Sequence, residues 1–246
     1  MPKQADTLKD YDRVIIKLFN QVFTPRQTRL PFTRENIEKV ASDLKIKIKN
    51  LGDVPYTYRV RGVLPDAITE KGNWVIEGTG KGKYAFVLLK RDIYVSVPED
   101  LAITDIPDAT PEIILKYGGP DEQGLLAQIR YNRLIDTFLS LTAYHLQGHL
   151  RSFVKDVGQV EIDDLYVGVN TNGEWFVIPV EAKGRHPTDR LGVIQVGQLI
   201  AFARQNYPEL TLRPVGVKGW LDGSIFLMEF NVADELDKIR TIRYKR

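Results

Sequence analysis

The stretch from Gln159 to Lys183 constrains the fold more than any other part of the chain. It reads QVEIDDLYVGVNTNGEWFVIPVEAK, so that two runs rich in apolar residues flank an Asn-Gly pair. An Asn-Gly pair between two such runs is a strong signal for a tight β-turn. The sequence therefore predicts a β-hairpin, with strands over residues 161–167 and 175–180 and a turn at 171–173.

Charged side chains gather where this hairpin ends. Side chains alternate between the two faces of a strand, so Glu161 and Asp163 share one face of the first strand. Glu181 and Lys183 share a face of the second strand, and Ala182 points the other way. Three carboxylates and one ammonium group are therefore expected to converge, which predicts a site for a cation that prefers oxygen ligands.

The same residues resemble the motif of the PD-(D/E)XK nuclease superfamily. Asp163 matches the first acidic position, and Glu181-Ala182-Lys183 matches the (Asp/Glu)-X-Lys element, 18 residues further on. Ile162 stands where the family has proline. The resemblance covers about residues 120 to 230 and implies a restriction-endonuclease-like α/β fold, in which helices flank a mixed β-sheet.

The resemblance also implies roles for these residues. Asp163, Glu181 and the Ala182 carbonyl would hold Mg²⁺, and Lys183 would orient or deprotonate a water molecule or stabilise developing charge. Asp164 is an alternative metal ligand to Asp163, and Glu161 is expected to assist a second ion or a ligand. Three further candidates come from the flanking helices: Gln195, with Gln198 as a second choice, and Glu122 as an additional acid.

The first part of the chain differs in charge from the second. Residues 1–105 hold 18 Lys and Arg against 14 Asp and Glu, whereas residues 106–246 hold 16 against 18. Predicted helices precede a second hairpin whose glycine-rich tip carries Lys81 and Lys83, an arrangement that resembles a winged helix. These lysines are placed to contact phosphates, although a solvated loop explains them equally well.

A linker rich in Pro, Asp and Gly, residues 98–120, divides the chain into a winged-helix-like domain, 1–105, and a nuclease-like domain, 106–246. Apolar spacing predicts one long helix over residues 121–150. His145 and His149 would lie one turn apart on it, which is a spacing that can hold a metal. Because no third ligand is apparent, exposed helix residues are the favoured interpretation.

Composition excludes several classes of protein. The chain has no cysteine, so disulfides and cysteine-based zinc sites are excluded. No apolar run reaches the roughly 20 residues that a membrane span needs. The first residues lack the pattern of a signal peptide, and a cytoplasmic location is expected.

The resemblance implies a Mg²⁺-dependent endonuclease that cuts double-stranded DNA, similar to type II restriction enzymes. Lys81, Lys83 and Arg185, the last in a polar loop after the motif, are expected to contact the DNA. A homodimer would allow both strands to be cut. The alternatives are a winged-helix DNA-binding regulator with an inactive nuclease-like domain, and a nuclease that acts on RNA or on branched DNA.

Overall fold

The computed structural model describes residues 3–61, 63–97, 101–119, 121–231 and 238–245. The chain forms two compact units. The first comprises residues 1–93 together with 153–159, and the second comprises residues 94–152 together with 160–246. The division at Ile93 lies earlier than the boundary predicted at residue 105, and the short segment 153–159 belongs to the first unit although the chain on either side of it belongs to the second.

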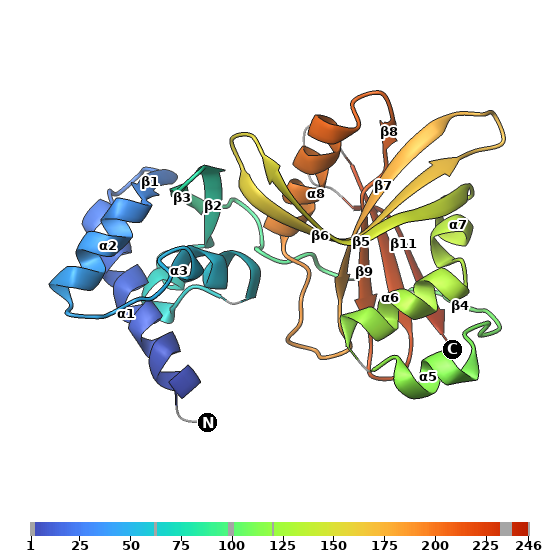
Figure 1. Cartoon of the computed structure of the whole chain (residues 1–246), viewed down its shortest axis with the longest axis horizontal. Helices are drawn as coiled ribbons and strands as arrows, with labels where there is room; N and C mark the ends of the chain where they lie inside the picture. Colours follow the sequence, from blue (N-terminus) through green and yellow to red (C-terminus); the bar gives the residue numbers. More distant parts are fainter. Residues whose placement is uncertain (1–2, 62, 98–100, 120, 232–237, 246) are drawn as a thin grey trace. The chain divides into compact units, whose positions relative to one another are not determined.

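The first unit combines helices with a three-stranded antiparallel sheet of order β1-β3-β2 (Figure 1). In chain order its elements are α1 (Lys3–Val22), β1 (Arg29–Thr33), α2 (Arg34–Asp43), α3 (Asp53–Tyr56), a π-helix (Thr57–Arg61), α4 (Asp66–Thr69), β2 (Trp74–Gly80) and β3 (Lys83–Leu88). Strands β2 and β3 form the hairpin that the sequence predicts, and Lys81-Gly82 is its turn.

An apolar face of α1 packs on this small sheet. Leu18 and Phe19 are buried, and the ring of Phe19 lies 5.2 Å from the ring of Trp74 and 5.0 Å from that of Phe86. Thr33 caps α2: its side chain accepts the Asn36 N–H, and the Asn36 side chain accepts the Thr33 N–H in return. The unit therefore has a core of its own.

The second unit is built on an eight-stranded mixed sheet. Seven strands follow the order β4-β11-β10-β9-β7-β6-β5, and β8 pairs with β7. Its elements are β4 (Ile103–Asp105), α5 (Glu112–Tyr117), α6 (Glu122–Tyr131), α7 (Leu134–Leu139), β5 (Thr142–Val154), β6 (Gly158–Val169), β7 (Trp175–Lys183), α8 (Val193–Asn206), β8 (Thr211–Leu212), β9 (Val215–Gly219), β10 (Ile225–Phe230) and β11 (Lys238–Lys245). The protein is thus mixed α/β, as expected.

Helices cover both faces of the larger sheet (Figure 1). Residues of α6 and α7 pack with Tyr166, Val180 and Ala182 in one apolar cluster. On the other face, Val196 of α8 packs with Phe230 and with other residues of the strands. Because side chains alternate along a strand, Val180 and Ala182 of β7 face α6, whereas Glu181 and Lys183 face the side of α8.

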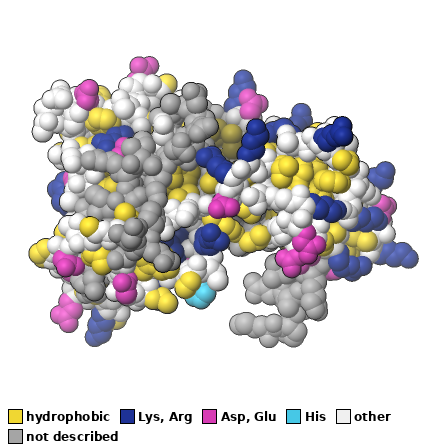
Figure 2. Space-filling model, turned by 180° about the vertical axis from the view of Figure 1, so that it is seen from behind, with side chains coloured by type: hydrophobic (Ala, Val, Ile, Leu, Met, Phe, Trp, Pro, Cys, Tyr) yellow, Lys and Arg dark blue, Asp and Glu magenta, His cyan; other side chains and the backbone are white. Residues whose placement is uncertain are grey.

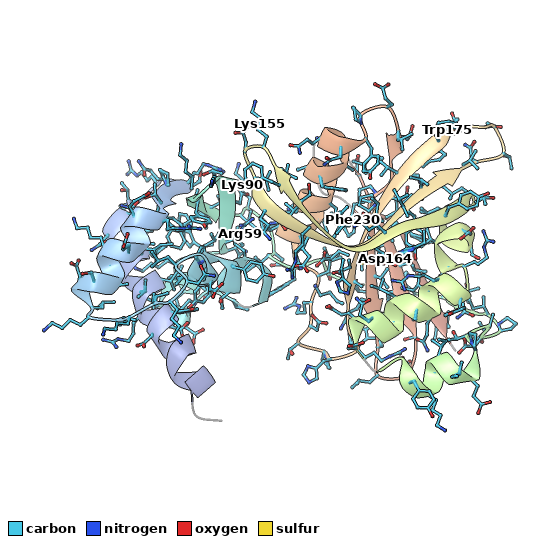
Figure 3. All side chains as sticks on the ribbon, viewed as in Figure 1. Arg59, Lys90, Lys155, Asp164, Trp175 and Phe230 are labelled. Carbon is cyan, nitrogen blue, oxygen red and sulfur yellow. The ribbon has the colours of Figure 1, made fainter. Side chains whose placement is uncertain are left out.

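The β6–β7 hairpin is confirmed, and both strands extend further than the sequence predicts. Asn170 closes the turn: its carbonyl accepts the Gly173 N–H at 3.1 Å, and its side chain accepts the Asn172 N–H at 2.9 Å. Gly173 has a φ of 79°, which glycine adopts at little cost. Trp175 lies at this end of the hairpin, at the opposite end of β7 from Glu181 (Figure 3).

The long helix predicted over residues 121–150 is wrong. The segment forms α6, then α7, and then the edge strand β5. Arg133 and Ser140 have φ values of 50° and 55°, and a residue in this left-handed region ends a helix. His145 and His149 therefore lie on a strand, and their predicted helical spacing does not exist.

The C-terminal segment is a strand inside the sheet. Strand β11 pairs antiparallel with β10 and parallel with β4, so it is not an edge strand. The linker predicted over residues 98–120 contains β4 and α5, and residues 98–100 and 120 lie outside the described residues. Among the described helices, none has the length and apolar character needed to cross a membrane.

Candidate active site

The register of β6 and β7 brings Asp163 and Glu181 to one face of the sheet. Asp164 pairs with Val180, so the preceding residue of β6 stands opposite the following residue of β7. Directly opposed side chains share a face. Asp163 also accepts the main-chain N–H of Ala182 at 2.8 Å, which fixes its carboxylate against β7.

Glu181 is the centre of a buried polar cluster. The Lys183 ammonium group donates to Glu181 Oε1 at 2.9 Å, and the Gln195 side-chain amide donates to the same oxygen. The Gln195 carbonyl oxygen accepts the Gly192 N–H at 3.1 Å, which anchors the first turn of α8. Glu122, in the first turn of α6, has an oxygen 3.6 Å from Lys183 Nζ. Residues from β6, β7, α6 and α8 therefore meet at this point.

With its acids ionised, the cluster would hold more negative than positive charge, because Asp163, Glu181 and Glu122 face one ammonium group, that of Lys183. Burial raises the pKa of Glu181 to about 8, and the charge of Asp163 adds to the rise. Burial likewise raises the pKa of Asp163, although the Ala182 N–H and Lys183 oppose it. Burial alone would lower the pKa of Lys183, but the charges of Glu181 and Glu122 outweigh it and hold that pKa above its ordinary value. Lys183 is therefore an ammonium group, and the carboxylates lack sufficient counter-charge.

Asp164 is committed to a different cluster on the opposite face. Its carboxylate accepts two hydrogen bonds from Arg130, at 2.9 and 2.7 Å, and one from the Tyr166 hydroxyl at 3.1 Å. His145 Nε2 lies 3.1 Å away, and Asp164 is fully buried on the side that faces α6 (Figure 3). Asp163, and not Asp164, therefore belongs to the candidate site.

Glu161 lies on the same face as Asp163, at the margin of the cluster. Arg151 of β5 donates to its carboxylate at 3.2 and 3.3 Å. Its charge is one of the influences that raise the pKa of Asp163, after the larger effect of burial. The structure therefore brings Asp163, Glu181, Lys183 and Gln195 together and places Glu161 beside them.

Lys218 is a residue of this region that the sequence does not single out. It stands beside Lys183 in the parallel register of β7 and β9, and it is buried. Its ammonium group donates to the carbonyl oxygens of Gly184 and His186. Burial lowers its pKa. A lysine in the short segment GVKGW carries no motif, so only the strand pairing reveals its position.

The predicted nucleic-acid contacts have two different environments. Lys81 and Lys83 are exposed at the β2–β3 turn of the first unit. Arg185 instead makes contacts within the second unit, because its guanidinium donates to the Trp220 carbonyl at 3.2 Å and to the Gln128 side chain. Arg185 therefore holds the segment after β7 in place.

The oxygen donors of this face fit a magnesium ion. Both hydrogen bonds to Glu181 fall on Oε1, and the bond to Asp163 falls on Oδ2, so each carboxylate keeps one oxygen outside these contacts. Among the described residues, no three His, Asp or Glu side chains are gathered so as to enclose a metal by themselves. Mg²⁺ usually takes one or two carboxylates and fills its remaining positions with water and substrate oxygens. The lack of counter-charge also favours a cation.

Comparisons of the chain with protein-family models, with curated proteins and with solved structures gave no match. Function is therefore inferred from the chemistry of the residues.

Proposed function

We propose that this protein is a Mg²⁺-dependent endonuclease that hydrolyses phosphodiester bonds in double-stranded DNA. The observation that carries the proposal is the convergence of Asp163, Glu181 and Lys183 on one face where β6 and β7 meet, with too little positive charge for the carboxylates. A divalent cation supplies that charge. In this unit the β6–β7 hairpin ends in the Glu-X-Lys element and is followed by helix α8. This order supports a restriction-endonuclease-like fold.

Each residue has a role that follows from its surroundings. Asp163, Glu181 and the Ala182 carbonyl would hold the ion, which when bound lowers the pKa of a water molecule and polarises the phosphate. Lys183 donates to Glu181 and lies beside Glu122, so its ammonium group is placed to stabilise negative charge on the phosphate. Gln195 holds the Glu181 carboxylate in place.

Three features of the first unit support a DNA-binding role. Its order of helix, strand, helix and β-hairpin, with the sheet order β1-β3-β2, is similar to a winged helix. Exposed Lys81 and Lys83 lie at the hairpin turn, where a wing contacts phosphates. In Figure 2, further Lys and Arg side chains surround an apolar patch on the face of this unit that is turned toward the viewer.

The proposal is tested by incubating the full chain with supercoiled plasmid and MgCl₂, with and without EDTA. Cleavage is expected only with the metal, and it should fall by at least about a hundredfold in Lys183→Ala and Glu181→Ala, because each substitution removes a charge that acts on the transition state. Glu209→Gln is the matched control, since it removes an exposed carboxylate of the same unit. Cleavage that survives in Lys183→Ala would refute the assignment.

A DNA-binding regulator with an inactive nuclease-like unit is the second candidate, and the winged-helix-like order of the first unit favours it. Tight DNA binding without cleavage in Mg²⁺, Mn²⁺ or Ca²⁺ would identify this function. Cleavage of RNA or of branched DNA in preference to plasmid would identify a nuclease with a different substrate. The proposed metal site would contact phosphates and not bases, so the site alone does not select among these substrates. Sedimentation analysis of the protein with and without DNA tests the proposed homodimer.

A further inference from the structure

Residues 184–190 form most of the segment between β7 and α8, and several hydrogen bonds hold them; His186, Pro187, Thr188 and Arg190 are exposed, whereas Gly184 is buried. Lys218 donates to the carbonyl oxygens of Gly184 and His186 from below. The Asp189 carboxylate accepts the Gly184 N–H, and the Asp189 N–H donates to the His186 carbonyl at 3.0 Å. These bonds tie the segment to itself and to β9, whereas several of its side chains face solvent. We name it the 184–190 loop.

The hydrogen bonds of His186 fix the position of its ring proton. Its Nδ1 lies 2.7 Å from the Thr188 hydroxyl and accepts the Thr188 main-chain N–H at 3.3 Å. A main-chain N–H can only donate, so Nδ1 presents a lone pair and the proton of the neutral ring is on Nε2. Within the described parts of the chain, Nε2 has no hydrogen-bond partner, and His186 is exposed.

The loop directly follows the candidate catalytic lysine. Two residues, Gly184 and Arg185, separate His186 from Lys183, so the two Cα atoms lie within about 11 Å of each other and a DNA strand with its phosphate at Lys183 would pass close to this loop. Exposed Arg190 adds a second positive group, and its guanidinium lies 4.2 Å from the centre of the Tyr94 ring. Preorganised donors on a rigid support are what a specific binding site requires, because no ordering cost is incurred on binding.

Resting on the proposed function, we propose that the 184–190 loop is a preformed DNA-contacting element in which His186 Nε2–H donates a hydrogen bond to the substrate. The acceptor is an oxygen or nitrogen of the DNA, either a phosphate oxygen or an acceptor on a base edge such as guanine N7 or O6. Lys218 is a positioning residue, since it acts through the main chain of the loop.

The test measures binding of the full chain to short fluorescent duplexes by anisotropy, with EDTA present so that the DNA stays intact. His186→Ala is expected to raise Kd about 5- to 30-fold, which corresponds to the loss of one hydrogen bond. His186→Gln, which keeps an N–H donor at a similar reach, should return Kd to within about threefold of wild type. Thr171→Ala, a change of an exposed uncharged residue in the turn at the opposite end of the β6–β7 hairpin, is the control and should leave Kd unchanged.

A set of duplexes that differ in sequence distinguishes the two acceptors. An equal loss of affinity on every duplex identifies a phosphate, whereas a loss confined to duplexes with one particular base pair identifies a base edge. Either result supports the inference. A Kd for His186→Ala within twofold of wild type on all duplexes would overturn it.

A second variant tests the positioning role of Lys218. Lys218→Met removes both hydrogen bonds that the ammonium group donates to the loop. Hydrogen exchange at the amides of residues 184–186, 188 and 189 should therefore accelerate, and Kd should rise although His186 is intact. Unchanged exchange would refute this role. The plasmid assay separates a failure of the proposed nuclease function from a failure of this inference. If the protein is not a nuclease, wild-type protein and Lys183→Ala both leave the plasmid uncut in Mg²⁺, whatever the effect of His186→Ala on Kd.

Discussion

Cation binding at the candidate site should release a proton from Glu181. Burial raises the pKa of this carboxyl to about 8, so at pH 7 it is protonated in about nine-tenths of the molecules. A metal ligand must be deprotonated. Binding of one Mg²⁺ is therefore expected to release about 0.9 proton at pH 7 and only about 0.1 at pH 9.

The sign of the pH dependence follows from the same shift. Below pH 8 the proton competes with the cation, so the apparent Kd for Mg²⁺ should fall about tenfold per pH unit as the pH rises and should level off above pH 8. The stability of the fold depends on pH in the opposite direction to Mg²⁺ affinity. The folded-state pKa lies above the ordinary value of 4.5, so the contribution of Glu181 to stability is present at low pH and is lost as the pH rises toward 8.

Isothermal titration calorimetry measures the released protons directly. The full chain is titrated with MgCl₂ at pH 7 in two buffers of different ionisation enthalpy, and the difference in binding enthalpy gives the proton number. Glu181→Gln should abolish both binding and release, whereas Glu209→Gln should change neither. Tight Mg²⁺ binding with the same enthalpy in both buffers would refute the reasoning.

Three further predictions concern the framework of the two units, and chemical denaturation measures each of them. Asp164→Asn should lower the free energy of unfolding by about 2 to 4 kcal/mol, because the Arg130 guanidinium then faces a neutral amide in place of a carboxylate. A loss below about 0.5 kcal/mol, which is the usual effect of a surface substitution, would contradict the argument from burial. Gly78→Ala should cost about 1 to 3 kcal/mol, since an added Cβ would lie 1.9 Å from the Val157 carbonyl oxygen, and an unchanged midpoint would show that this approach is not close in solution. Thr33→Ala should cost about 1 kcal/mol and Thr33→Ser much less, because only the serine keeps the capping oxygen; equal losses in both would show that the cap contributes nothing.

Local signals in the sequence predict the centre of the second unit. The Asn-Gly turn and the alternation of side chains are enough to place β6 and β7, and alternation alone puts Glu181 and Lys183 on one face. The sequence alone does not decide between Asp163 and Asp164 as the residue of the candidate site, because the decision requires knowing which helices cover each face of the sheet. It depends on which face of β6 lies against α6, and that becomes visible only through Arg130 and Tyr166.

The error over residues 121–150 has a physical cause. The apolar residues of α6 and α7 keep helical spacing, and the polar side chains of β5 resemble an exposed helix face because β5 is an edge strand with both faces partly open to solvent. The two interruptions are at Arg133 and Ser140, which are not residues that usually mark a left-handed turn. Lys218 was missed for a different reason, since its partners are main-chain carbonyls far away in sequence.

The membership of residues 153–159 in the first unit affects how the protein can be taken apart. The polypeptide passes between the two units three times, after Ile93, after Ser152 and after Gln159. A fragment that stops at residue 93 lacks the piece whose Val157 carbonyl lies against Gly78, so its surface there would be uncovered. A single protease nick near residue 94 would correspondingly leave two polypeptides that remain associated, because the first unit is then assembled from both of them.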